Sequence, residues 1–115
     1  MNSAPGLRIV QSAAEVVPAP VRVAVVIPCY RARATILDVL AAIGPECHAV
    51  YVVDDGCPDD TGRHVQDGSS DPRVRVIQQD NRGVGGAVLA GYRAALDDGA
   101  AILVKLDADG QMDPR

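Results

Sequence analysis

The chain has 115 residues, 48% of them hydrophobic and 23% charged, a balance typical of one globular domain and not of a disordered segment. Its net charge of −4, the lack of Trp and Phe and the presence of only three Tyr argue against nucleic acid as a partner, because such surfaces are basic and stack bases on aromatic rings. Three cysteines without a C-x-x-C spacing favour neither a disulfide framework nor a zinc knuckle, and indicate a reducing, cytoplasmic compartment. No apolar run approaches the roughly 18 residues of a membrane span.

Residues 1–20 are predicted to be a flexible arm, because they contain Pro5, Gly6, Pro18 and Pro20 and no continuous apolar stretch. The same features argue against a signal peptide. The folded region is therefore expected over residues 21–115.

Short apolar runs rich in β-branched residues alternate with helical patterns from residue 21 onward. In chain order the predicted elements are a strand over 21–28, a helix over 35–43, a strand over 48–53, a helix over 61–66, a strand over 74–78, a helix over 83–98 and a strand over 101–106. The first, second and last strands are predicted to be buried. This order predicts an α/β fold with an open, mostly parallel, Rossmann-like sheet and helices on both faces.

The helix ends have recognisable signals. Thr35 and Asp38 match a capping box, and Asp59 or Asp60 is a candidate cap for the second helix. The long helix closes at Gly99, and its apolar stripe is expected to consist of the following residues: Val84, Val88, Tyr92 and Leu96.

Each predicted strand ends in a distinctive polar cluster. In an open parallel sheet, ligands bind outside the carboxyl ends of the strands, so these clusters are expected to converge on one rim. They are, in chain order, Pro28-Cys29-Tyr30, Asp54-Asp55-Gly56, Asp80-Asn81-Arg82-Gly83 and Asp107-Ala108-Asp109-Gly110-Gln111.

Asp107 and Asp109 are candidate metal ligands. Side chains two residues apart in extended backbone point to one side, and Gln111 is next in that series. An oxygen-only set suits Mg²⁺ or Mn²⁺, completed by diphosphate oxygens. The alternative is that Asp109 and Gly110 form only a turn and that Asp107 is a cap.

Two other clusters have a functional and a structural interpretation. A carboxylate of Asp54 or Asp55 can accept a hydrogen bond from a base N–H or a ribose hydroxyl, or both can belong to a loop that precedes a helix cap. Arg82 can pair with a phosphate at the N-terminus of the long helix. Equally, the small residues that follow it can serve only to bring that helix close to the sheet.

Four stretches together resemble the N-terminal half of a glycosyltransferase family 2 domain with the GT-A fold, from the subgroup similar to dolichyl- and polyprenyl-phosphate mannosyltransferases. They are VVIPCY (25–30), VVDDGCPDDT (52–61), NRGVGGA (81–87) and KLDADGQMDP (105–114). The resemblance implies an inverting, metal-dependent transfer from a GDP- or UDP-sugar to a lipid phosphate or a saccharide, at the cytosolic face of a membrane in a longer protein.

The resemblance also assigns residues to this site. Pro28, Tyr30 and Asp55 align with positions around the base and ribose, with Asp54 beside them, while Arg82 and Lys105 lie nearby. Asp107 and Asp109 align with the metal-binding pair, and Gln111 with a further metal contact. Arg31-Ala32-Arg33 departs from the family's usual Asn-Glu, and Cys57 replaces its usual Ser. Acceptor-binding residues and any general base are expected beyond Arg115, so the chain alone is expected to turn over slowly or not at all.

Three alternatives to this function remain open from the sequence. A nucleotide-binding module would use the same site without catalysis. A phosphotransferase or phosphatase would use Asp107 as its nucleophile. A non-enzymatic interaction domain would leave the acidic loops solvated.

Overall fold

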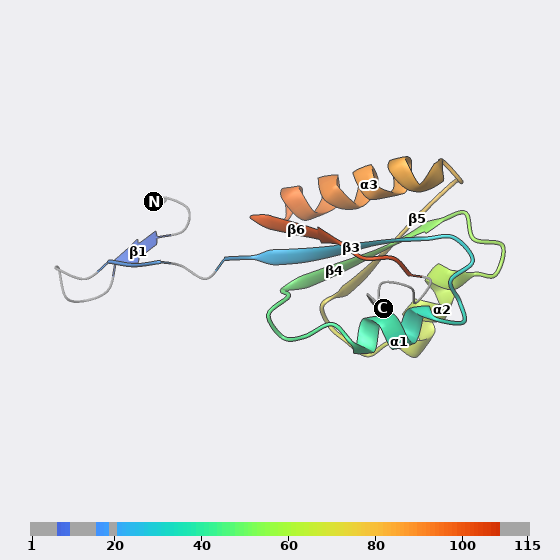
Figure 1. The fold of residues 1–115 in the computed structure, drawn as a ribbon, viewed down its shortest axis with the longest axis horizontal. Helices are drawn as coiled ribbons and strands as arrows, with labels where there is room; N and C mark the ends of the chain where they lie inside the picture. The colour runs from blue at the N-terminus through green and yellow to red at the C-terminus, as the bar shows by residue number, and fades with distance from the viewer. Residues whose placement is uncertain (1–6, 10–15, 19–20, 109–115) are drawn as a thin grey trace, which may run out of the picture.

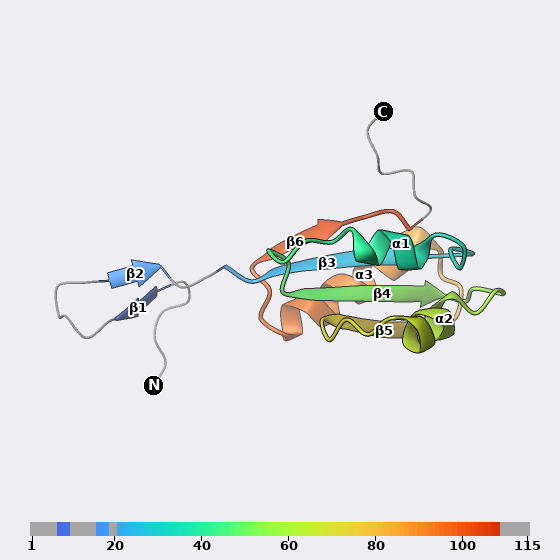
Figure 2. The ribbon, with the colours of Figure 1, turned by 90° about the horizontal axis from the view of Figure 1, so that it is seen from below.

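A four-stranded, all-parallel sheet in the order β5-β4-β3-β6 forms the centre of the fold (Figure 2). The computed structural model describes residues 7–9, 16–18 and 21–108. Within them the sheet consists of β3 (Val23–Cys29), β4 (Ala49–Asp55), β5 (Val74–Gln79) and β6 (Ile102–Lys105). A separate antiparallel pair, β1 (Leu7–Ile9) with β2 (Val16–Pro18), lies within the predicted arm.

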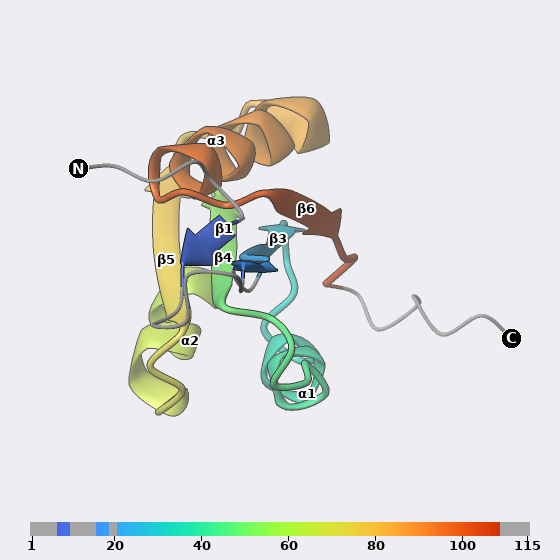
Figure 3. The same cartoon turned by 90° about the vertical axis from the view of Figure 1, so that its left-hand side faces the viewer.

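Helices cover both faces of the sheet (Figures 1 and 3). The helices α1 (Ile36–Ala41) and α2 (Thr61–Gly68) lie on one face, and α3 (Gly83–Asp97) lies on the other. The predicted α/β class, with its parallel sheet between two helical layers, is therefore confirmed. Each crossover from one strand to the next contains one of these helices, which places all four carboxyl ends of the strands at the same edge.

The two central strands carry the core. All seven residues of β4 are buried, and β3 is buried along nearly its whole length. Alternate side chains serve the two faces: Val25 and Ile27 pack with α1 and α2, whereas Val26 packs with α3. Continuous burial of this kind is what a parallel sheet between two helical layers requires.

The last strand differs from its prediction as a buried strand. In β6 the side chains of Ile102 and Val104 are 47% and 38% exposed. The reason is its position, since β6 pairs with β3 on one side and no strand of the described residues lies on its other side. An apolar, β-branched sequence does not by itself distinguish a central strand from an edge strand.

The predicted apolar stripe of the long helix packs on the sheet only in part: Tyr92 packs against the core and Val88 is partly buried, but neither is a fully buried residue of the helix. The buried residues of α3 are Ala87, Gly91 and Ala95, whereas Val84 and Leu96 are 63% and 58% exposed. The reason is that the backbone of α3 lies very close to the sheet at Gly91. A Cβ placed on Gly91 would lie 2.4 Å from Cγ1 of Val26 and 3.2 Å from Cγ2 of Val53.

We expect Gly91→Ala to lower the free energy of unfolding by about 1–3 kcal/mol, because the added methyl overpacks a fully buried contact with Val26. Gly85→Ala is the matched control, since no heavy atom lies within 4 Å of its Cβ position. Alanine there is expected to stabilise the helix by up to about 1 kcal/mol. Urea unfolding of both variants checks this, and equal stability of the two would contradict the close-packing argument.

Neither predicted side-chain cap forms. The Thr35 hydroxyl donates to the carbonyls of Ala32 and Ala108 and does not cap α1, so the capping box with Asp38 is wrong. At the start of α2, Asp60 occupies the predicted N-cap position in left-handed backbone (φ 56°), but its side chain makes no hydrogen bond to the helix. The carboxylate of Asp59, the other candidate, accepts from the Arg33 N–H and the Thr61 hydroxyl. The cap of α2 comes instead from the sheet, through Asp54, as described below.

Candidate functional site

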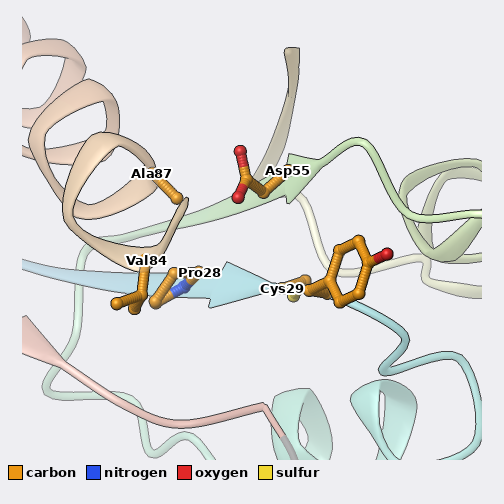
Figure 4. Close-up of a pocket in the computed structure, with 6 residues that line it drawn as sticks. Pro28, Cys29, Asp55, Val84 and Ala87 are labelled. Carbon is orange, nitrogen blue, oxygen red and sulfur yellow. The ribbon is translucent and has the colours of Figure 1, made fainter. Parts of the chain in front are cut away.

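A cavity of about 70 Å³ lies at the carboxyl edge of the sheet (Figure 4). It joins the end of β3, the end of β4 and the first turn of α3. Three residues that the sequence assigns to the site, Pro28, Tyr30 and Asp55, lie on its wall. The full lining is Pro28, Cys29, Tyr30, Asp55, Val84 and Ala87.

Asp55 is the charged group of this cavity. Its side chain is buried, with 3% of the residue exposed. Its Oδ1 accepts hydrogen bonds from Nε2 of Gln79 at 3.0 Å and from the backbone N–H of Arg82 at 2.8 Å. Among the residues that the structure describes, no donor contacts its Oδ2. Asp55 thus holds a fixed orientation with one oxygen free to accept a further hydrogen bond.

Asp54 points away from the cavity, because neighbouring residues of a strand face opposite sides of the sheet. Its carboxylate is 5% exposed. Oδ1 accepts from the backbone N–H of Cys57 and Oδ2 from that of Gly62, each at 2.7 Å. Gly62 lies in the first turn of α2, so Asp54 caps this helix and closes the loop before it. Both of its oxygens are therefore engaged within the protein.

Tyr30 lies on the outer rim of the cavity at the end of β3, and Arg31 follows it in the chain. The Tyr30 residue is 49% exposed, and the Arg31 guanidinium carbon lies 5.4 Å from the centre of the Tyr30 ring. This distance is in the range of a cation–π contact. Arg31 has left-handed backbone (φ 60°), which is uncommon for a non-glycine residue and turns the chain sharply after the strand.

The acidic segment after β6 is only partly described. Lys105 Nζ lies 3.2 Å from Asp107 Oδ1, and both side chains are about half exposed, at 41% and 55%. An exposed pair of this kind contributes little to stability, so Asp107 is free to exchange it for another cation. The Thr35 hydroxyl donates to the carbonyl of Ala108, which ties this segment to the loop before α1. The other two predicted metal ligands, Asp109 and Gln111, lie outside the described residues.

The described part of the chain contains no group of three or more His, Cys, Asp or Glu side chains placed to hold a metal ion. The backbone N–H of Arg82 donates to Asp55, and Arg82 itself is exposed to solvent. The predicted convergence of strand ends therefore holds for the first three clusters, and the fourth is described only as far as Ala108.

The sequence did not single out Gln79, Val84 or Ala87 as site residues. Gln79 is paired in register with Asp55, so strand alignment would have placed it beside that carboxylate. Val84 and Ala87 reach the cavity because α3 begins at the carboxyl edge of the sheet. A helix that starts at this edge brings one side of its first turn to the site.

Comparison with known proteins gives the family. The model of glycosyl transferase family 2 matches residues 24–115. The chain belongs to glycosyltransferase family 2. The matched region starts in β3 and includes every element that lines the cavity, so the cavity lies within the family 2 domain.

Several proteins with similar sequences bear names that refer to lipid phosphates. The polyprenol monophosphomannose synthase of Mycolicibacterium smegmatis is 38% identical over 98 residues, which cover 81% of this chain and 37% of that protein. The undecaprenyl-phosphate mannosyltransferase of Micrococcus luteus is 43% identical over 67 residues, 56% of this chain and 28% of that protein. The dolichol-phosphate mannosyltransferase of Pyrococcus furiosus is 33% identical over 98 residues, which cover 81% of this chain and 27% of that protein. The aligned part of the chain thus corresponds to 27–37% of the length of these relatives.

Among the helices of the described residues, none has the length and apolar character needed to cross a bilayer.

Proposed function

We propose that this chain provides the nucleotide-sugar-binding part of an inverting glycosyltransferase that transfers a sugar to a polyprenyl phosphate. The observation that carries the proposal is the cavity in which Pro28, Tyr30 and the free oxygen of Asp55 meet at the carboxyl edge of a parallel sheet. Membership of family 2 supports the reaction type. The names of the relatives support the acceptor class.

In this proposal, the cavity receives the base of the nucleotide. Oδ2 of Asp55 accepts a hydrogen bond from a ring N–H, while Pro28, Val84 and Ala87 provide apolar contacts. Guanine and uracil both have a ring N–H beside a carbonyl group, whereas the corresponding ring nitrogen of adenine is an acceptor that a carboxylate repels. The geometry therefore favours GDP- and UDP-sugars as donors over ADP-sugars.

We further propose that Asp107, Asp109 and Gln111 hold Mg²⁺ or Mn²⁺ at the same edge. Their carboxylate and amide oxygens are donors that hard divalent cations prefer, and the Asp107 carboxylate is exposed. Such a cation, when bound, neutralises charge on the leaving diphosphate. Lys105 and Arg82 add positive charge near the strand ends, which attracts an anionic donor. Acceptor binding is assigned to parts of the relatives that this chain does not align with.

Nucleotide titration tests the proposal. The chain is expected to bind GDP or UDP with Mn²⁺ present and to gain about 2.7 kcal/mol of stability at a ligand concentration of 100 times Kd, because the ligand binds only the folded state. ADP at the same concentration is expected to give less stabilisation, because it has the same diphosphate but no ring N–H at the corresponding position of its base. Calorimetric titration and thermal unfolding measure both effects. Equal binding of ADP would exclude the assigned role of Asp55.

The same titration distinguishes the contribution of the metal to binding from that of the base pocket. EDTA, or Asp107→Asn, is expected to weaken binding of the diphosphate and to leave binding of the uncharged nucleoside unchanged. If EDTA had no effect on either ligand, the metal assignment would be wrong while the base pocket would stand.

A further inference from the structure

Three consecutive backbone N–H groups of the loop between β3 and α1 each donate to a different side chain of the segment from Cys57 to Thr61, the first residue of α2. Arg31 N–H donates to Cys57 Sγ at 3.3 Å, and Ala32 N–H donates to Thr61 Oγ1 at 3.1 Å. The third, Arg33 N–H, donates to Asp59 Oδ2 at 3.2 Å. We call these three side chains the amide clamp: Cys57, Asp59 and Thr61.

Two members of the amide clamp, Cys57 and Thr61, are buried, whereas Asp59 is half-buried, and all three accept hydrogen bonds from the loop. Thr61 and Cys57 are 0% and 8% exposed. The Thr61 hydroxyl donates to Asp59 Oδ1 at 2.6 Å, and the Cys57 thiol donates to the carbonyl of Cys29 at 3.2 Å. Burial raises the pKa of the Cys57 thiol, which keeps it protonated as a donor. Burial also acts to raise the pKa of Asp59, but hydrogen bonds from Thr61 and Arg33 outweigh it, so that this pKa is lowered and the acceptor stays charged.

The clamp itself is anchored to the sheet. Asp54 binds the N–H groups of Cys57 and Gly62, on either side of Asp59. An unbroken set of hydrogen bonds therefore runs from the end of β4, through the clamp, to the loop that follows Tyr30. That loop includes Arg31, whose left-handed backbone needs external support because it is disfavoured for a residue with a Cβ.

We propose that the amide clamp is a positioning device that fixes the Tyr30 ring on the rim of the nucleotide cavity. The inference rests on the proposed function, because it assigns the clamp a role in nucleotide binding. None of the clamp side chains lines the cavity, so they act through Tyr30 and Arg31 and not by contact with the ligand. The clamp pre-organises the rim, and its loss lowers the fraction of molecules ready to bind.

The test uses Thr61→Val, which replaces the hydroxyl by a methyl group of similar size. We expect the Kd for GDP or UDP to rise about threefold to tenfold, in line with the loss of one buried hydrogen bond. Amide exchange at residues 31–33 is expected to accelerate, whereas exchange at Val52 in the core of β4 stays unchanged. Thr61→Ser, which keeps the hydroxyl, is expected to restore both. If Thr61→Val does not fold, Cys57→Ala and its rescue by Cys57→Ser test the same point.

Two controls separate positioning from general loss of stability. Val65→Ala removes apolar contacts one turn along α2 at a fully buried position, without touching the loop, and is expected to leave Kd unchanged. In a Tyr30→Ala background, Thr61→Val is expected to have no further effect on Kd, because the group that it positions is gone. An equal loss of affinity in Val65→Ala, or additive effects with Tyr30→Ala, would overturn the inference. Absence of nucleotide binding by the unmodified chain would instead overturn the proposed function, while the exchange rates still report on the clamp.

Discussion

Asp55→Asn is expected to weaken binding of GDP or UDP by tenfold to about 100-fold while the chain remains folded. The asparagine carbonyl oxygen can still accept from the Arg82 N–H, which preserves the turn before α3. The amide nitrogen then replaces the free carboxylate oxygen, so a base N–H meets a donor and not a charged acceptor. Loss of a charged hydrogen bond costs roughly 1.5–3 kcal/mol, which corresponds to this change in Kd. Calorimetric titration of the variant measures it.

Asp97→Asn is the matched control for Asp55→Asn, because it makes the same change of charge at an exposed position at the end of α3. Its nucleotide affinity is expected to equal that of the unmodified chain. Should Asp55→Asn also bind normally, with a melting temperature close to that of the control, the cavity would not be the base site.

The fold could be predicted because the sequence patterns that indicate its strands and helices are local. Buried β-branched runs followed by helical patterns predict β3, β4 and the parallel direction of the strands without reference to any distant contact. The packing face of α3 could not be predicted this way. Val84 and Leu96 have the hydrophobicity of a core face, but Gly91 lies opposite Val26 and only that tertiary contact decides the orientation.

In the site, too, some features could be predicted from the sequence and others could not. The rule that ligands bind at the carboxyl ends of parallel strands placed the strand-end clusters at one edge, and the family resemblance singled out Pro28, Tyr30 and Asp55, which the structure brings to one cavity. The roles of the Asp54–Asp55 pair could not be separated, because alternation along a strand indicates that they face opposite sides but not which side contains the cavity. Which of the two carboxylates faces the cavity depends on where α2 and α3 begin.

The amide clamp was also beyond prediction from sequence. The sequence indicates a helix cap at Asp59, and at Cys57 only a departure from the usual Ser of the family. Their partners are backbone N–H groups of the loop between β3 and α1, more than twenty residues earlier in the chain. Backbone donors leave no trace in the sequence, so hydrogen bonds of this type become visible only in a structure.

Asp54→Ala is expected to lower the free energy of unfolding by about 2–6 kcal/mol, because it leaves the N–H groups of Cys57 and Gly62 without their acceptors and each costs roughly 1–3 kcal/mol when unsatisfied. A domain is typically stable by about 5–15 kcal/mol, so this variant approaches the limit of folding. Urea unfolding measures the change. Asp54→Asn keeps one acceptor and is expected to fall between the alanine variant and the unmodified chain.

The comparison of Asp54 with Asp55 decides whether two adjacent carboxylates have separate roles. Asp54 supports α2 and, through Cys57 and Gly62, the amide clamp, whereas Asp55 lines the cavity. Asp54→Asn is therefore expected mainly to lower stability, with a rise in Kd no larger than that of Thr61→Val, whereas Asp55→Asn is expected mainly to raise Kd with little change in stability. If both variants changed stability and affinity in the same proportion, a single structural role for the pair would replace this division, because loss of folded protein alone would then explain the loss of binding.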